Sequence, residues 1–156
     1  MPDLARLPTE SFIIRAATAE DAPAIRDLIR AVRINPFDLA WRRFVVASTS
    51  EGQIIGCGQI KPHADGTREL ASIAVRPGWR RGGIAREVIQ RLMVSHTGPL
   101  YLTCRASLGE FYAKFGFRRV EPAKMPAHYQ RIQRLSQLLK ALKLLREDLW
   151  VMKADN

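Results

Sequence analysis

The residues best suited to chemistry lie in a glycine-rich turn with two arginines at its mouth. This turn, Arg80 to Ile84, follows the strand-like run Glu69 to Val75 and precedes a segment of helical periodicity. The first amides of a helix lack internal partners and carry the positive end of the helix dipole, so they attract anions. Glycines allow close approach, and guanidinium groups match phosphate oxygens. The pattern predicts a phosphate cradle, although an isolated Gly-Gly pair is also typical of an ordinary turn with solvated arginines.

Two common nucleotide-binding patterns are missing from this turn. No Gly-Lys-Ser/Thr follows it, as a P-loop requires, and the G-x-G-x-x-G spacing of a dinucleotide fingerprint does not occur. Nucleoside triphosphates and NAD are therefore disfavoured as ligands.

Two motifs resemble the GNAT superfamily of acetyl-CoA-dependent N-acetyltransferases. The first is a hydrophobic strand followed by V-x-P-x-[aromatic]-R-x-x-G-x-[G/A], filled here by Val75, Pro77, Trp79, Arg80, Gly83 and Ala85. The second is [L/F]-Y-x-K-x-G-F, filled by Phe111, Tyr112, Lys114, Gly116 and Phe117. Both stand in the family's order, and the resemblance extends from Phe12 to Val120, about 70% of the chain.

The resemblance implies that acetyl-CoA binds as co-substrate and that no metal takes part. Its pantetheine arm would pair with the backbone of the strand residues Ile73, Ala74 and Val75, in a cleft where the fourth and fifth strands splay apart. Its pyrophosphate would bind the turn and the first helical turn, namely Arg80, Arg81, Gly82, Gly83, Ile84, Ala85 and Arg86. At two positions the chain departs from the family's pattern, because Arg105 replaces a frequent asparagine and Leu108 an alanine.

Direct acetyl transfer requires a neutral amine, yet a lysine-type amine has a pKa of about 10.4. Glu69 shares strand parity with Ile73 and Val75 and is expected to face the same side. In several family members a glutamate at this place takes the amine proton, whereas Tyr112 matches the tyrosine that protonates the leaving thiolate. The alternatives are that Glu69 is simply a polar residue at a strand start and that Tyr112 merely packs against the cofactor.

The acceptor is an amine that the sequence does not identify, whether of a small molecule, a peptide or a protein. By analogy with similar proteins, the acceptor side would be bordered by Asn35, Phe37 and Trp41 and by the region Met125 to Tyr129.

The balance of charged residues favours anionic partners. Lys and Arg number 25 against 15 Asp and Glu, which gives a net charge of +10. A basic nucleic-acid-binding module is therefore one alternative, though nucleic acid is disfavoured because no recognition motif occurs. A second alternative is a sensor that binds acyl-CoA without turnover.

The remaining candidate ligands for a metal are few and scattered. His63, His96 and His128 show no metal-ligand spacing, and Cys57 and Cys104 lie in separate apolar runs, as buried free thiols do. No signal peptide or membrane span is evident, so a cytoplasmic protein without membrane partners is expected.

The alternation of elements predicts an α/β fold of GNAT type within a single domain, residues 1–156. We expect a mixed, mostly antiparallel twisted sheet of about six to seven strands, flanked by helices and with splayed central parallel strands. Residues 1–10 are expected to be a flexible N-terminus, and 127–156 a C-terminal helix plus a last strand. That helix, predicted over His128 to Arg146, is basic and amphipathic; packing on the sheet, a homodimer contact and membrane-surface binding all fit its pattern.

Overall fold

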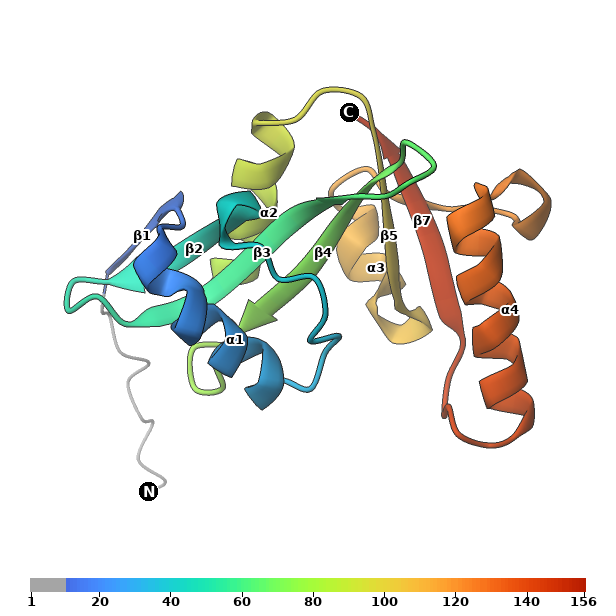
Figure 1. Ribbon diagram of the computed structural model, residues 1–156, viewed down its shortest axis with the longest axis horizontal. Coiled ribbons are helices and arrows are strands. Elements are labelled where there is room, and N and C mark those ends of the chain that lie inside the picture. Colours follow the sequence, from blue (N-terminus) through green and yellow to red (C-terminus); the bar gives the residue numbers. More distant parts are fainter. Residues whose placement is uncertain (1–10) are drawn as a thin grey trace, which may run out of the picture. The chain divides into compact units, whose positions relative to one another are not determined.

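The fold is given by a computed structural model that describes residues 11–156 (Figure 1). The predicted flexible N-terminus, residues 1–10, lies outside the described residues. Within the described range, seven strands form one mixed sheet of order β1-β2-β3-β4-β5-β7-β6, accompanied by helices α1 to α4. Most of the recorded pairings are antiparallel, and β4 and β5 are parallel. The predicted mixed, mostly antiparallel α/β fold is confirmed.

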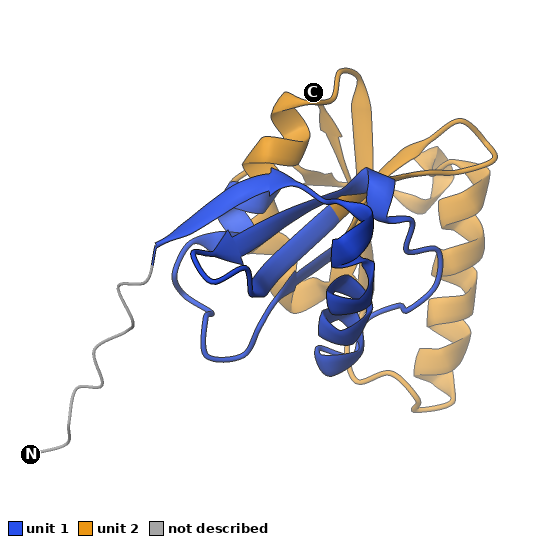
Figure 2. Ribbon diagram, turned by 60° about the vertical axis from the view of Figure 1, so that its left-hand side comes forward, with its two compact units in different colours: residues 1–58, 72–88 blue, residues 59–71, 89–156 orange. Residues whose placement is uncertain are grey.

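The chain divides into two compact units (Figure 2), and β3, β4 and α2 each contribute residues to both. The first unit consists of the chain up to Gly58 together with Ser72–Val88. The second consists of Gln59–Ala71 together with Ile89–Asn156.

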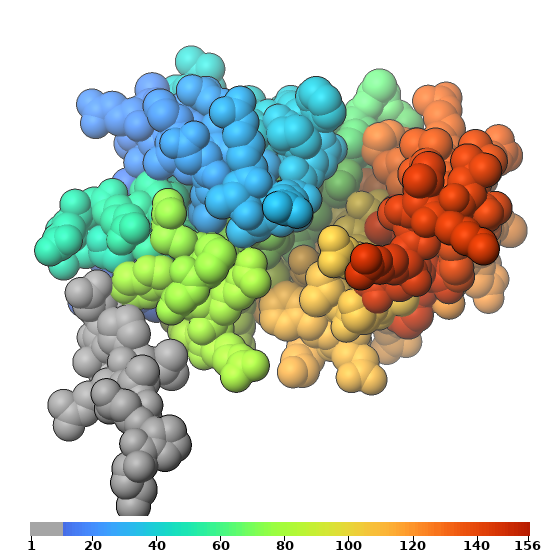
Figure 3. Space-filling model, turned by 90° about the horizontal axis from the view of Figure 1, so that it is seen from below, coloured from blue at the N-terminus to red at the C-terminus, as the bar shows by residue number. Residues whose placement is uncertain are grey.

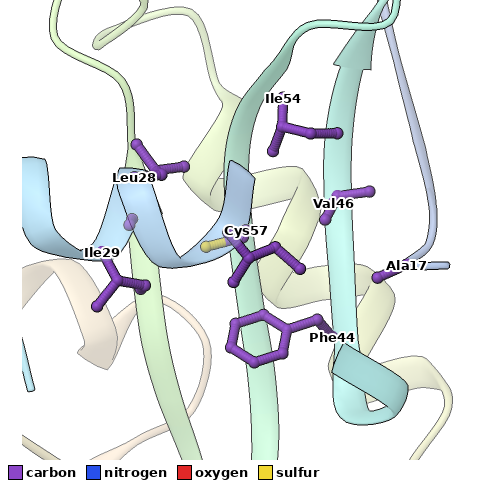
Figure 4. Close-up of a cluster of buried hydrophobic side chains, with 9 residues drawn as sticks. Ala17, Leu28, Ile29, Phe44, Val46, Ile54 and Cys57 are labelled. Carbon is purple, nitrogen blue, oxygen red and sulfur yellow. The ribbon is translucent and has the colours of Figure 1, made fainter. Parts of the chain in front are cut away.

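The first unit is built around α1, which packs its apolar stripe on strand residues. Its elements are β1 (Phe12–Ala16), α1 (Ala22–Ala31), β2 (Phe44–Thr49), the first part of β3 (Ile54–Pro62), the last part of β4 (Arg68–Val75) and the start of α2 (Ile84–Val94). Figure 4 shows Leu28 and Ile29 of α1 beside Phe44, Val46 and Cys57 of the strands. The helical spacing of the apolar residues therefore produced the expected buried face.

The entry of the chain into α1 is fixed by a capping box in the short turn Ala19–Asp21 that precedes the helix. The Asp21 carboxylate accepts a hydrogen bond from the Thr18 backbone N–H at 2.8 Å and from two nitrogens of Arg15 at 2.7 and 3.0 Å. The Arg15 hydrogen bond is the main reason that the pKa of Asp21 falls from 3.8 to about 2. Thr18 and Asp21 thus tie β1 to the following helix.

The second unit is organised by its last strand. Its elements are β5 (Pro99–Arg105), α3 (Gly109–Ala113), β6 (Arg118–Arg119), α4 (Ala127–Ala141) and β7 (Leu149–Asp155). β7 pairs antiparallel with all seven residues of β5 and, on its other side, with the two residues of β6. α3 approaches β7 so closely that a side chain at Gly109 would collide with the ring of Trp150. β7 is therefore an inner strand of the sheet.

The predicted end of the C-terminal helix was wrong. The helix ends at Ala141 and not near Arg146, because Lys143 adopts a left-handed conformation (φ 58°). The N–H of Leu144 donates to the Leu139 carbonyl and that of Lys143 to the Lys140 carbonyl, which is a Schellman ending with lysine where glycine is usual.

α4 packs by its first half and exposes leucines in its second. Tyr129 is buried with Met125 and Val151, and Ile132 packs against this cluster. Three leucines that follow one another at helical spacing are 56, 57 and 60% exposed: Leu135, Leu138 and Leu142. Packing on the sheet thus accounts for the first half of the apolar face. That the exposed leucines make a dimer contact or bind a membrane surface stays a prediction. None of the helices described is long and apolar enough to span a bilayer.

Candidate functional site

The predicted phosphate cradle forms a surface turn of the first unit, between the end of β4 and the start of α2. Arg80, Arg81, Gly82 and Gly83 are exposed, whereas Ile84 is 2% exposed and anchors the helix start. Figure 3 shows this part of the chain, in yellow-green, at the surface. The N–H of Glu87 makes a helical bond to the Gly83 carbonyl, which leaves the preceding amides of α2 for other partners.

The conformation of the turn depends on glycine at one position in particular. Gly83 has a φ of +79°, and a Cβ built on it would meet no atom within 4 Å, so the space over it is open. Arg81 is also left-handed, with a φ of 71°. A left-handed residue directly before a helix turns successive amides toward the same side, an arrangement that suits an anion.

The turn is held by backbone bonds to β3 and by a close packing contact. The N–H of Arg76 donates to the Ile55 carbonyl at 2.8 Å, and its guanidinium donates to the Ile54 carbonyl at 3.3 Å. A Cβ on Gly56 would lie 2.5 Å from Cγ2 of Ile84. The glycine in β3 therefore lets the start of α2 sit directly on the strand.

The strand-parity argument made from the sequence assumes that β4 is regular, and one residue of the strand is not. Strand parity placed Glu69 on the same face as Ile73 and Val75, but Ser72 between them has a left-handed backbone (φ 58°). Such a residue interrupts the alternation of sides along a strand. Ile73, Ala74 and Val75 belong to the first unit and Glu69 to the second, so the common face stays a prediction.

Glu69 is paired with a histidine in the second unit. Its Oε2 lies 2.7 Å from Nε2 of His63, and the two side chains are 13 and 14% exposed. The β3–β4 turn brings the two residues together, since the N–H of His63 bonds to the Thr67 carbonyl and the N–H of Gly66 to the His63 carbonyl. Glu69 is therefore more than a solvated residue at a strand start.

The sequence suggested that the histidines are scattered, but two of them, His63 and His128, lie together. The ring of His128, at the start of α4, stacks on that of His63 with centroids 3.7 Å apart and planes 24° apart. The backbone N–H of His128 donates to the Asp65 carboxylate at 3.4 Å. The earlier interpretation was wrong for these two residues because 65 positions separate them in the chain and the fold removes that distance.

The cluster of His63, Glu69 and His128 could in principle hold a metal ion, since its ligand atoms lie within 4.8 Å of one another. The lone pair of an imidazole nitrogen lies in the ring plane, and a zinc ion sits about 2 Å from each nitrogen. Two rings stacked nearly in parallel cannot both direct their lone pairs at one ion. As the rings lie, the cluster suits proton sharing better than metal binding.

Burial and neighbouring charges set the titration of this cluster. Burial lowers the pKa of His128, and the adjacent His63 lowers it further. Burial raises the pKa of Tyr129, with a further contribution from the Glu69 carboxylate. The Tyr129 hydroxyl is buried and makes no hydrogen bond of good geometry among residues 11–156, although the Thr67 side chain is close by. Both shifts favour the neutral form of the group.

Tyr112, the predicted general acid, lies in α3. Its ring contacts Phe111 and Phe117 edge to face, with centroids 5.0 and 6.2 Å apart. Burial raises the pKa of Tyr112 to about 12, with a smaller contribution from Cys104. The hydroxyl therefore keeps its proton over the whole working pH range, as a proton donor must, and its role in transfer stays a prediction.

The predicted acceptor-side residues fall into two groups. In the first unit, the N–H of Phe37 donates to the Asn35 side chain at 3.0 Å, Phe37 is 75% exposed, and Trp41 carries the Arg42 guanidinium over its ring. In the second unit, Met125 and Tyr129 are 6 and 0% exposed and belong to a core cluster. The first group offers side chains to a ligand, whereas Met125 serves packing.

A mixed sheet in which β4 runs through a glycine turn into α2 defines an acyl-CoA-binding acetyltransferase fold. A sequence model of the acetyltransferase (GNAT) domain matches residues 40–119, just over half of the chain. The chain belongs to this family of acyltransferase enzymes. No match was found among curated proteins.

Solved structures share the fold at low sequence identity. N-acetylglutamate synthase from Neisseria gonorrhoeae, complexed with coenzyme A and N-acetyl-glutamate, superposes with a TM-score of 0.72 at 20% identity over 92% of this chain. The chain spans 35% of that enzyme. Rv2747 from Mycobacterium tuberculosis, in complex with CoA, gives 0.68 at 21% identity, over 92% of this chain and 99% of that one. The ribosomal-protein-S18-alanine N-acetyltransferase from Escherichia coli gives 0.60 at 18% identity, covering 92 and 93%.

Proposed function

We propose that the protein is an N-acetyltransferase that moves the acetyl group of acetyl-CoA to an amine by direct attack in a ternary complex. The observation that supports this most is the Arg80–Ile84 turn, with its left-handed glycine, open space and helix start. A pyrophosphate can bind there through backbone amides and the helix dipole. The family makes acetyl-CoA the donor to expect at this turn.

For the acceptor we propose the amine of an amino acid or of a peptide N-terminus. The Neisseria enzyme was solved with N-acetyl-glutamate and with L-arginine, and the E. coli enzyme acts on an alanine of a ribosomal protein. Phe37, together with Asn35 and Trp41, is the proposed acceptor-side surface, because 75% of the Phe37 side chain is exposed to solvent. These residues would determine which acceptor binds, whereas Glu69 and Tyr112 would carry out the proton transfers.

The proposed chemistry gives each reacting proton a place. The acceptor ammonium loses its proton to the base at Glu69, and the neutral nitrogen attacks the thioester carbonyl carbon. The carbon–sulfur bond then breaks, and the departing thiolate takes a proton from the Tyr112 hydroxyl. The resulting phenolate takes the second proton of the acylated nitrogen, which leaves the neutral amide. The pKa of about 12 keeps Tyr112 protonated until that moment, and the His63 partner keeps Glu69 in place.

The first experiment is calorimetric titration with acetyl-CoA of the unaltered protein and of two glutamate variants. Gly83→Glu places a carboxylate in the proposed cradle, and a unit charge about 4 Å from a phosphate costs about 4 kcal/mol near a protein surface, close to a thousandfold in affinity. Gly52→Glu is the matched control, because Gly52 is also exposed, left-handed (φ +84°) and open. Loss of binding in Gly83→Glu with binding kept in Gly52→Glu is expected. Equal affinities would exclude the turn as the cofactor site.

A turnover screen then follows CoA release from acetyl-CoA with each of the twenty L-amino acids and with alanine-initiated peptides. Release that depends on one acceptor class supports the enzyme. An acyl-CoA sensor would bind acetyl-CoA and release CoA with none of them, and a nucleic-acid-binding module would not bind acetyl-CoA at all.

A further inference from the structure

The strongest unexplained feature is that the proposed base has an imidazole as its immediate partner. Oε2 of Glu69 and Nε2 of His63 are 2.7 Å apart, and both side chains are about seven-eighths shielded from solvent. Two lone pairs would repel each other at this distance, so a proton lies between the atoms. The pair therefore already contains one proton, and an incoming proton must go to a different atom.

Two atoms of the pair can receive that proton, Oε1 of Glu69 or Nδ1 of His63. The ordinary pKa of an imidazole is about 6.5 and that of a glutamate carboxyl about 4.3. A carboxylate beside an imidazolium favours the charged form of both. An imidazole nitrogen is in general a stronger base than a carboxylate oxygen, so the incoming proton goes to the ring and the carboxylate stays ionised beside it.

We propose that His63 is the proton acceptor of the acetyl transfer, with Nδ1 as the receiving atom and Glu69 as the carboxylate that holds the imidazolium. This proposal rests on the proposed function and refines the part given there to Glu69. The N–H bond of the acceptor ammonium breaks, a new N–H bond forms at Nδ1, and the electron pair left on the nitrogen attacks the thioester. No electron transfer and no additional reactant are required.

His128 and its neighbours support this role of His63. The stacked His128 ring covers one face of His63 and keeps it on the Glu69 carboxylate. Burial and the nearby His63 lower the pKa of His128, against opposing contributions from Glu69 and Asp65, so a second positive charge beside a protonated His63 is disfavoured. Asp65, Tyr129 and Arg131 are the other charged or titratable groups recorded beside the stack among residues 11–156.

The His63–Glu69 pair predicts different effects on the pH profile of kcat for two glutamine substitutions. In His63→Gln the amide can still hydrogen-bond to Glu69, but the proton acceptor is lost, so kcat should fall by about 100-fold or more. The low-pH limb of the kcat profile should vanish with it. In Glu69→Gln the imidazole that accepts the proton remains, so this variant should keep its low-pH limb and part of its activity.

The test measures these profiles with the best L-amino acid from the screen, beside His96→Gln as a control for histidine loss elsewhere. The KM for acetyl-CoA should stay constant, and circular dichroism confirms that each variant is folded. A His63→Gln variant that keeps its low-pH limb, with Glu69→Gln inactive, would overturn the proposal and return the base to Glu69. No turnover by the unaltered protein with any amino acid or peptide would instead refute the proposed function itself.

A second test, by NMR spectroscopy, detects the protonated nitrogen of His63 directly and requires no acceptor substrate. Nitrogen-15 NMR of the three histidine rings should find neutral His63 protonated at Nε2, the nitrogen that faces Glu69. A neutral His63 protonated at Nδ1 would contradict the proposed hydrogen bond and with it the assignment of the receiving atom.

Discussion

Replacing Gly56 by alanine should displace the start of α2 and so weaken the proposed cofactor-binding turn. A Cβ at this position would lie 2.5 Å from Cγ2 of Ile84, and the branched, buried Ile84 has little freedom to turn away. The other neighbours, the Ala74 carbonyl at 3.4 Å and the Ala47 methyl at 3.5 Å, are at ordinary contact distance. One atom therefore accounts for the whole obstacle, and it belongs to the first residue of α2.

The expected size follows from two opposing effects. Reaching 3.4 Å from 2.5 Å requires a shift of about 0.9 Å, and overpacking of this kind costs about 1–3 kcal/mol. Alanine in place of glycine in a strand gains about 0.5–1 kcal/mol through lower entropy of the unfolded chain. The net loss of unfolding free energy should therefore lie between about 0 and 2.5 kcal/mol. Acetyl-CoA affinity should fall as well, because the amides that follow Ile84 move with it.

The assay is a double-mutant cycle with Ile84→Ala, which removes Cγ2. By itself Ile84→Ala should cost about 2–5 kcal/mol through the cavity that it leaves. Adding Gly56→Ala to it should then be neutral or stabilising, since the new methyl enters that cavity. Urea unfolding followed by tryptophan fluorescence measures the four free energies. If Gly56→Ala costs the same in both backgrounds, the steric argument is refuted.

Three further predictions concern single side chains. Tyr112→Phe should lower kcat about 10- to 100-fold with the acetyl-CoA affinity unchanged in calorimetry, and full activity would exclude the proton donor. The folded pKa of Asp21 is about 2 against an ordinary 3.8, so the stability that its carboxylate contributes is complete above pH 4 and is lost as the pH falls toward 2. Asp21→Asn should remove this part of the dependence of urea unfolding on acid pH. An unchanged slope of unfolding free energy against pH would contradict the ion pair with Arg15. Burial raises the pKa of Cys57 to about 12, so its thiol should resist a disulfide reagent at pH 8 until urea unfolds the chain, and rapid labelling of the folded protein would refute its burial.

Local signals carried most of the fold prediction. Apolar spacing located α1 and α2, and the Gly-Gly turn located the start of α2. The end of α4 was missed because Lys143 occupies the left-handed position at which glycine would have marked it. The inner position of β7 was missed because pairing order is a property of the whole sheet.

In the candidate site, too, features built from contiguous residues could be predicted, whereas contacts between distant residues could not. The cradle could be found from the sequence because all its parts are contiguous, from Arg80 to Arg86. The partner of Glu69 lies six residues away across a turn, and the Asp65-Gly66 turn signal could have indicated a hairpin that pairs them. The stacking of His128 on His63 had no such signal, since it depends on where α4 begins.

The inner position of β7 has a consequence for biosynthesis. On the ribosome β5 and β6 emerge before the strand that separates them, and the seven pairs of β5 cannot close until Asp155 is free of the exit tunnel. Contacts between strands about 50 residues apart form slowly, because a long loop must close first. Until then Leu100, Leu102 and Cys104 stand on an open strand edge, which attracts other chains. Until β7 has emerged, the nascent second unit therefore presents apolar strand residues of the kind that chaperones bind.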